Sequence, residues 1–127
     1  MTAPINPVIW FEIPAADLER AKAFYEQALG IELSLHEVGK RRTARFPTSD
    51  AVGGIGGSLV QAHSYVPSFA GTLVYFAVDD IEVALARIKA CGGKVISPMI
   101  GTESGHVAHF EDTERNRIGL RSLRQPP

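Results

Sequence analysis

Two stretches of equal length, VIWFEIPAADLERAKAFYEQALG at 8–30 and GTLVYFAVDDIEVALARIKACGG at 71–93, follow the same pattern. Each begins with a run rich in β-branched and aromatic residues, which is typical of a strand, and continues with apolar residues at helical spacing. A shift of 63 positions aligns them, with five identities over residues 11–30. The sequence therefore predicts an internal repeat in which a strand leads into an amphipathic helix.

The helices are predicted over 17–29 and 80–91, each with one apolar face. Gly30 and the Gly92–Gly93 pair suit the left-handed conformation that commonly ends a helix. Asp79 and Glu82 have capping-box spacing, which predicts Asp79 as the residue that caps the second helix.

Three further strand-like runs follow each helix, separated by residues typical of turns. They cover 31–37, 41–46 and 55–60 in the first half, and 94–97, 106–111 and 118–122 in the second. Pro98 and the glycines at 101 and 105 are expected to lie between strands. The predicted order is therefore βαβββ, twice.

This order predicts a single α+β domain over 1–127, with one module at about 6–61, a linker at about 62–70 and a second module at about 71–123. A helix on one face of a mixed four-stranded sheet leaves the other face uncovered. Two such curved sheets, in one chain or from two chains, are expected to enclose a cavity that binds a ligand.

Composition excludes several classes of function. Thirteen Lys and Arg against fourteen Asp and Glu give a formal charge of −1, so a nucleic acid or an anionic membrane is not an expected partner. The single cysteine rules out an intramolecular disulfide. Without an apolar run of about 20 residues or signal-peptide features at the amino terminus, the expected location is the cytoplasm.

Alternation along the first strand places Trp10 and Glu12 on the face opposite the helix, and the shift of 63 gives Leu73 and Tyr75 as their counterparts. An indole, a phenol and a carboxylate around one cavity suit a small aromatic or cationic ligand. Glu12 is a candidate general base if burial raises its pKa. Alternatively, the aromatic residues fill the cavity and an arginine neutralises Glu12.

His109 and Glu111 share one face of a predicted strand, whereas His106 points to the opposite face because it lies three residues from His109. Together with Glu12, these two residues form a candidate metal site. The alternative is that the histidines are ordinary surface or hydrogen-bonded residues.

The repeat and several short motifs resemble the vicinal oxygen chelate superfamily, which includes glyoxalase I, bleomycin-resistance proteins and extradiol dioxygenases. The motifs are Phe11–Pro14 before Asp17–Ala21, Val78–Ile81, Gly92–Val95, and Phe110–Asp112 followed by Asn116–Ile118. The resemblance implies the paired-module fold over nearly the whole chain. It also implies a homodimer, because short members of this group commonly build their cavity from two chains.

Metal-dependent members of that superfamily hold a divalent ion at four positions, two on the first strands and two on the last strands of the modules. The corresponding residues here are Trp10, Leu73, Ser58 and Gly119. Three of them have no donor atom to offer, and a serine hydroxyl is a poor ligand. The comparison therefore predicts no cofactor and no metal ion in the usual place.

Three functions remain open. The first is binding of a small organic molecule in a metal-free cavity, with Trp10, Glu12, Ser58, Leu73, Tyr75, His109 and Gly119 as candidate lining residues. The second is a glyoxalase-like lyase, isomerase or dioxygenase with a divalent ion displaced to Glu12, His109 and Glu111. The third is a structural module whose cavity is filled by its own side chains.

Overall fold

A computed structural model describes residues 7–49, 55–103 and 105–122, and all ten predicted elements are present in it. They are β1 (Trp10–Pro14), α1 (Leu18–Leu29), β2 (Ser34–Val38), β3 (Arg41–Arg45), β4 (Gly56–Gln61), β5 (Tyr75–Ala77), α2 (Ile81–Ala90), β6 (Lys94–Thr102), β7 (Gly105–Glu111) and β8 (Arg117–Ser122).

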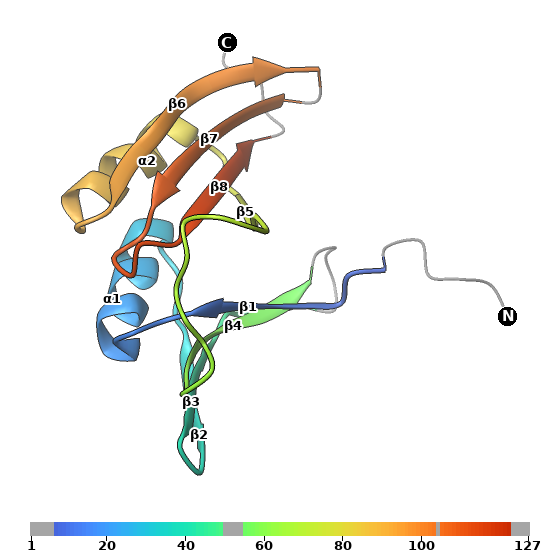
Figure 1. Ribbon diagram of the computed structural model, residues 1–127. Helices are drawn as coiled ribbons and strands as arrows, with labels where there is room; N and C mark the ends of the chain where they lie inside the picture. Colours follow the sequence, from blue (N-terminus) through green and yellow to red (C-terminus); the bar gives the residue numbers. More distant parts are fainter. Residues whose placement is uncertain (1–6, 50–54, 104, 123–127) are drawn as a thin grey trace, which may run out of the picture.

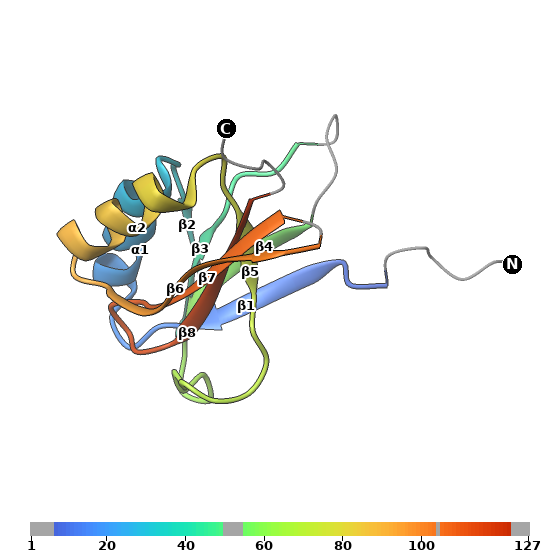
Figure 2. The same ribbon diagram turned by 90° about the horizontal axis from the view of Figure 1, so that it is seen from above.

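The strands form two mixed four-stranded sheets with the same topology, in the orders β1-β4-β3-β2 and β5-β8-β7-β6. In each module the first strand is parallel to the last, and the other pairs are antiparallel. Figure 1 shows the second sheet above and the first below, and Figure 2 shows the two helices packed together on one side of the molecule. The predicted α+β class and the repeated βαβββ order are confirmed.

Both helices begin at an aspartate whose side chain caps the first turn. Asp17 accepts a hydrogen bond from the Arg20 amide at 3.1 Å, and Asp80 accepts one from the Val83 amide at 3.2 Å. The cap of α2 is therefore Asp80, and the prediction of Asp79 was wrong by one residue. Gly30 ends α1 with φ +68°, as the sequence predicted.

One hydrophobic core joins the modules. The ring centroids of Phe11 in β1 and Phe76 in β5 are 5.8 Å apart, and those of Phe46 and Phe76 are 5.2 Å apart. Tyr25 of α1 is fully buried against Phe46 and Phe76. The faces of β1 and β5 that carry phenylalanine are therefore turned toward each other.

The turn between β7 and β8 fastens the second module to the first. Asp112 accepts a hydrogen bond from the Tyr25 hydroxyl at 2.6 Å, and the Asn116 side chain donates to the Pro14 carbonyl at 2.8 Å. Glu114 accepts from the amides of residues 16 and 17 at 2.9 and 2.8 Å. Burial, followed by the Asp112 carboxylate, raises the pKa of Tyr25 well above its ordinary value.

Several strand boundaries differ from the prediction, and β1 and β2 begin later than expected, at Trp10 and Ser34. β6 continues through Pro98 and Gly101 to Thr102, and its pairing with β7 shifts register between Val95 and Ser97 and again before Ile100. An edge strand tolerates a proline because one side of it needs no donors, and β6 is at the edge of its sheet. β5 begins only at Tyr75, so Leu73 lies in the segment that precedes the strand.

Candidate functional site

The uncovered face of the first sheet brings together three residues predicted from the sequence. Glu12 of β1 and Ser58 of β4 are register partners, and Trp10 lies against Gly56, where an added Cβ would be 2.8 Å from the indole. They border a small hollow of about 110 Å³. Its lining residues are Trp10, Glu12, His36, Val38, Arg41, Thr43, Arg45 and Ser58.

Glu12 is held by two partners. Arg41 of β3 forms an ion pair with its carboxylate, and the Tyr65 hydroxyl donates a hydrogen bond to it at 2.7 Å. Arg41 also donates to the Tyr65 oxygen at 2.8 Å, and its guanidinium lies 5.1 Å from the centre of the Tyr65 ring. The three side chains form a closed polar triangle at the edge of the hollow.

This triangle determines the charge on Glu12. Burial by itself would raise the pKa of the Glu12 carboxyl, but the hydrogen bonds from Tyr65 and Arg41 outweigh it and hold that pKa below its ordinary value. The shift is opposite to the one on which the general-base hypothesis depends. The alternative prediction, that an arginine neutralises Glu12, agrees with the ion pair to Arg41.

Arg45 is the second cation of the hollow. It pairs in register with Ser58, directly beside Glu12, and its side chain is exposed. Within residues 7–49, 55–103 and 105–122 its side chain makes no hydrogen bond or ion pair. Because Glu12 already balances Arg41, the guanidinium of Arg45 is available for an acidic or carbonyl oxygen of a ligand.

The uncovered face of the second sheet carries the other candidates. Tyr75, Gly119 and His109 are register neighbours on β5, β8 and β7. The Tyr75 ring lies against Gly119, where an added Cβ would be 2.3 Å from the nearest ring carbon. Glu111 lies two residues from His109 along β7 and therefore on the same face.

The two candidate faces are separate within one chain. The core is formed by Phe11 and Phe76, which alternate along their strands with Trp10 and Glu12 and with Tyr75. Since the phenylalanine faces meet, the faces with the candidate residues point away from each other. A cavity that uses both faces therefore needs two chains, which is the second of the two arrangements considered from the sequence.

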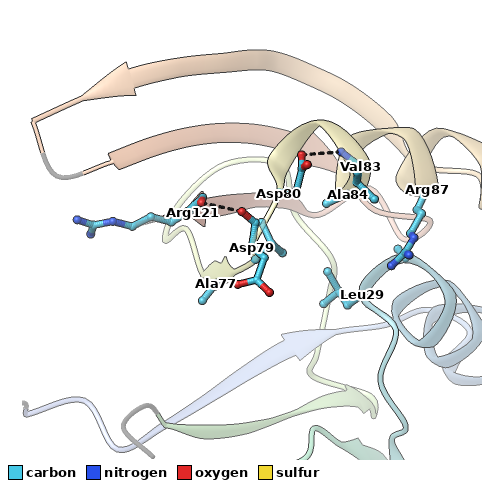
Figure 3. A pocket seen from close by; sticks show the side chains of 11 residues that line it. Leu29, Ala77, Asp79, Asp80, Val83, Ala84, Arg87 and Arg121 are labelled. Carbon is cyan, nitrogen blue, oxygen red and sulfur yellow. Dashed lines mark hydrogen bonds between the residues drawn. The ribbon is translucent and has the colours of Figure 1, made fainter. Parts of the chain in front are cut away.

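A larger hollow of about 490 Å³ contains none of the candidate ligand-binding residues predicted from the sequence. It lies where the end of α1 meets the start of α2 beside β5, and Figure 3 shows Arg87 reaching over Leu29 there, while Arg121 points outward. Asp80 is occupied by capping, and Ser122 donates to the Asp79 carbonyl at 3.1 Å. The Asp80 carboxylate and the Asp79 carbonyl are therefore already engaged within the chain.

Sequence reasoning missed Arg41 and Arg45 as lining residues of the hollow and Tyr65 as a partner of Glu12. The alternation of Arg41, Thr43 and Arg45 along the predicted strand was a usable signal, because alternate residues share a face. Tyr65 gave none, since it lies in the segment interpreted as a linker and reaches Glu12 across 53 positions of sequence.

Comparison with known proteins identifies the family. The family model of the Glyoxalase/Bleomycin resistance protein/Dioxygenase superfamily matches residues 8–120. The chain belongs to this superfamily.

Relatives of this superfamily member include a glyoxylase-like domain-containing protein of Didymella fabae, 31% identical over 109 residues, with 83% of this chain and 84% of that protein covered. A putative glyoxylase of Mycobacterium bovis is 34% identical over 91 residues, which cover 71% of this chain and 33% of that protein. The chain therefore spans about a third of the mycobacterial relative.

Solved structures agree on the fold. Glyoxalase I from Zea mays superposes with a TM-score of 0.70 at 20% identity, covering 92% of this chain and 46% of the maize protein. A glyoxalase/bleomycin resistance protein from a Streptomyces species gives 0.67 at 26% identity, covering 89% and 97%. Over the residues that the structure describes, no helix is long and apolar enough to cross a membrane.

The metal site of this superfamily does not fit the residues of this chain. The four positions that the resemblance predicts as ligand positions hold Trp10, Leu73, Ser58 and Gly119, of which only Ser58 has a side-chain oxygen, and that serine is 2% exposed. Among the described residues of one chain, no three His, Cys, Asp or Glu side chains are grouped so that they could hold an ion. The alternative metal site of Glu12, His109 and Glu111 cannot form within one chain, because Glu12 lies on one sheet and the other two residues lie on the other.

Proposed function

We propose that this protein binds a small organic molecule without the superfamily's metal ion, in a cavity formed between two copies of the chain. The observation that carries the proposal is the chemistry of the four ligand positions. An indole, an isobutyl group and a bare glycine cannot bind a divalent ion, and a lone serine hydroxyl cannot replace the imidazole and carboxylate donors that such ions require.

The side chains around the first hollow indicate the class of ligand. Trp10 is 46% exposed and offers a flat apolar surface, while Arg45 offers a guanidinium with no partner among the described residues. An aromatic or apolar body with one acidic or carbonyl oxygen satisfies both groups. Glu12 and Arg41, already paired, contribute shape and hydrogen bonds rather than net charge.

A second copy of the chain is the proposed partner. Trp10, Val38 and Tyr75 are apolar side chains on the two uncovered sheet faces, with exposures of 46%, 78% and 45%. Facing sheets from two chains would cover these side chains and bring Trp10 of one chain near Tyr75 of the other. Sedimentation equilibrium is expected to give twice the monomer mass, and a monomer at micromolar concentration would contradict this arrangement.

The metal-free state is tested by elemental analysis. Protein expressed in medium supplemented with nickel, zinc, iron and manganese, and then dialysed without chelator, is expected to carry far less than one ion per chain. A near-stoichiometric ion would contradict the proposal and favour the metal-dependent lyase, isomerase or dioxygenase, with Glu12, His109 and Glu111 brought together by two chains.

The pocket contains its own reporter, because Trp10 is the single tryptophan of the chain. Titration with benzoate and acetophenone is expected to change the fluorescence of Trp10 with saturation and to raise the melting temperature. Glu12→Ala is expected to weaken binding. Glu37→Ala is the matched control, since Glu37 also pairs with an arginine but lies on the opposite face of the same sheet. Equal affinities of the two variants would place the ligand elsewhere.

A further inference from the structure

Three side chains from neighbouring strands form a hydrogen-bonded chain on the uncovered face of the second sheet. The Tyr75 oxygen of β5 lies 2.7 Å from Nε2 of His109 on β7, and Nδ1 of the same ring lies 2.9 Å from Nη2 of Arg117 on β8. The phenol and imidazole ring centroids are 5.5 Å apart. The order of contacts is therefore Arg117, His109, Tyr75.

The direction of these hydrogen bonds follows from the guanidinium, which only donates. Nδ1 of His109 must hold a lone pair toward Arg117, so the single proton of the neutral ring is on Nε2 and is donated to the Tyr75 oxygen. The Tyr75 hydroxyl is then an acceptor in this contact, and its own proton has no acceptor in the chain of three. Tyr75 itself is 45% exposed, so that proton can reach a ligand.

Burial and the Arg117 charge favour the neutral form of the His109 ring. Ser97 of β6 and Gly119 of β8 are its register partners, Glu111 is two residues along β7, and Arg117 is opposite Glu111. The ring of Phe69 covers the Arg117 guanidinium at 5.6 Å, and Nε of Arg117 is buried without a partner among the described residues. Burial, and after it the Arg117 charge, lower the pKa of His109 below its ordinary value of 6.5.

We propose that the Tyr75 hydroxyl donates the hydrogen bond that recognises an acceptor oxygen of the ligand, a ketone or a carboxylate, and that His109 and Arg117 are positioning residues that orient it. This inference rests on the proposed function. Tyr75 lies against Gly119, so its phenol occupies the space that a side chain at position 119 would take. Recognition of an oxygen by a neutral O–H donor replaces recognition by an ion.

The test compares three probes of similar size, namely acetophenone, benzoate and ethylbenzene. Dissociation constants are measured by calorimetry for the wild type and Tyr75→Phe, which keeps the ring on Gly119. A lost neutral hydrogen bond is worth about three- to tenfold in affinity. We expect that loss for acetophenone or benzoate, with ethylbenzene unchanged within about twofold, and the probe that loses affinity identifies the ketone or the carboxylate as the ligand group.

The positioning role has its own readouts. Nitrogen NMR of the His109 ring is expected to show the proton on Nε2, and Arg117→Gln is expected to mix the two tautomers and weaken acetophenone binding. Arg117→Lys, which keeps a donor-only group, is expected to restore both. Since acetophenone does not titrate, its affinity should stay constant down to below pH 6.5 and then fall as His109 gains a proton facing Arg117.

The outcomes separate the two proposals. If none of the three probes binds the wild type, the proposed function fails and the inference fails with it. If acetophenone and benzoate bind Tyr75→Phe as tightly as the wild type, or if the proton is on Nδ1, the inference alone is overturned. Gly101→Ala on β6 controls for changes to this sheet, because the added Cβ would lie 3.8 Å from the nearest side chain, at an ordinary contact distance.

Discussion

Replacement of Glu114 by glutamine tests the contact that fixes one module on the other. The Glu114 side chain is completely buried and accepts five hydrogen bonds. They come from the amides of Ala16 and Asp17 at 2.9 and 2.8 Å, from Nε and Nη2 of Arg20 at 2.8 and 3.0 Å, and from the Thr113 hydroxyl at 2.9 Å. Glutamine keeps the shape and one acceptor oxygen but turns an amide NH₂ toward donors.

The magnitude follows from which bonds are lost. The oxygen of the glutamine can still accept from Ala16, Asp17 and Nη2 of Arg20, whereas Nε of Arg20 and the Thr113 hydroxyl lose their acceptor. The carboxylate charge that pairs with Arg20 is also lost. Hydrogen bonds to charged groups contribute about 1.5–3 kcal/mol each, but Arg20 is 52% exposed and regains water when released. We expect Glu114→Gln to lower the free energy of unfolding by about 2–3 kcal/mol, or roughly 8–12 °C in melting temperature for a domain of this size.

The pH dependence adds a second check. Burial would raise the pKa of Glu114, but the hydrogen bonds from Arg20 and Asp17 outweigh it, so the folded-state pKa lies below the ordinary value of 4.5. A depressed carboxyl pKa stabilises the fold above about pH 4.5, and that contribution is lost as the pH falls through the folded-state value. The difference between wild type and Glu114→Gln should therefore shrink in acid. Burial raises the pKa of Asp112, but Asp112 is present in both proteins, so its contribution to the pH dependence cancels in the difference.

Chemical denaturation at pH 7 and pH 4, followed by circular dichroism, measures both quantities. Glu37→Gln is the matched control, since Glu37 pairs with Arg42 at 2.9 Å but is 58% exposed, and it is expected to cost about 0.5 kcal/mol. If Glu114→Gln proved no more destabilising than Glu37→Gln, or if its effect grew in acid, the module contact would not depend on the buried carboxylate.

Two further predictions concern single contacts. Gly57→Ala places a methyl group into the ring of Phe11 and is expected to lower the free energy of unfolding by about 1–3 kcal/mol. Gly101→Ala is the control and should lower it far less. Equal effects of the two variants in urea denaturation would contradict this prediction. Asp80→Ala removes the cap of α2 and is expected to lower the free energy of unfolding by about 1 kcal/mol, measured as a decrease in melting temperature. An unchanged melting temperature would show that water replaces Asp80 as the partner of the Val83 amide.

Local patterns in the sequence were sufficient for the elements of the fold. Alternation along β1 correctly separated Trp10 and Glu12 from Phe11, because successive side chains of a strand point to opposite faces. The shift of 63 aligned Asp17 with Asp80, and both prove to be helix caps, although capping-box spacing had predicted Asp79 for the second helix. The end of β6 was less predictable, because proline and glycine at a sheet edge do not end a strand as they do elsewhere.

The residue types at the predicted ligand positions also follow from the sequence alone, because Gly119 has no donor atom in its side chain in any fold. The partners of the candidate residues were not. Tyr65 reaches Glu12 across 53 positions, and Glu114 reaches Asp17 across 97, because such contacts depend on how the modules pack. The pKa of Glu12 depends on Tyr65 and Arg41, and Tyr75 contacts His109 across 34 positions, so only the tertiary structure decided these interactions.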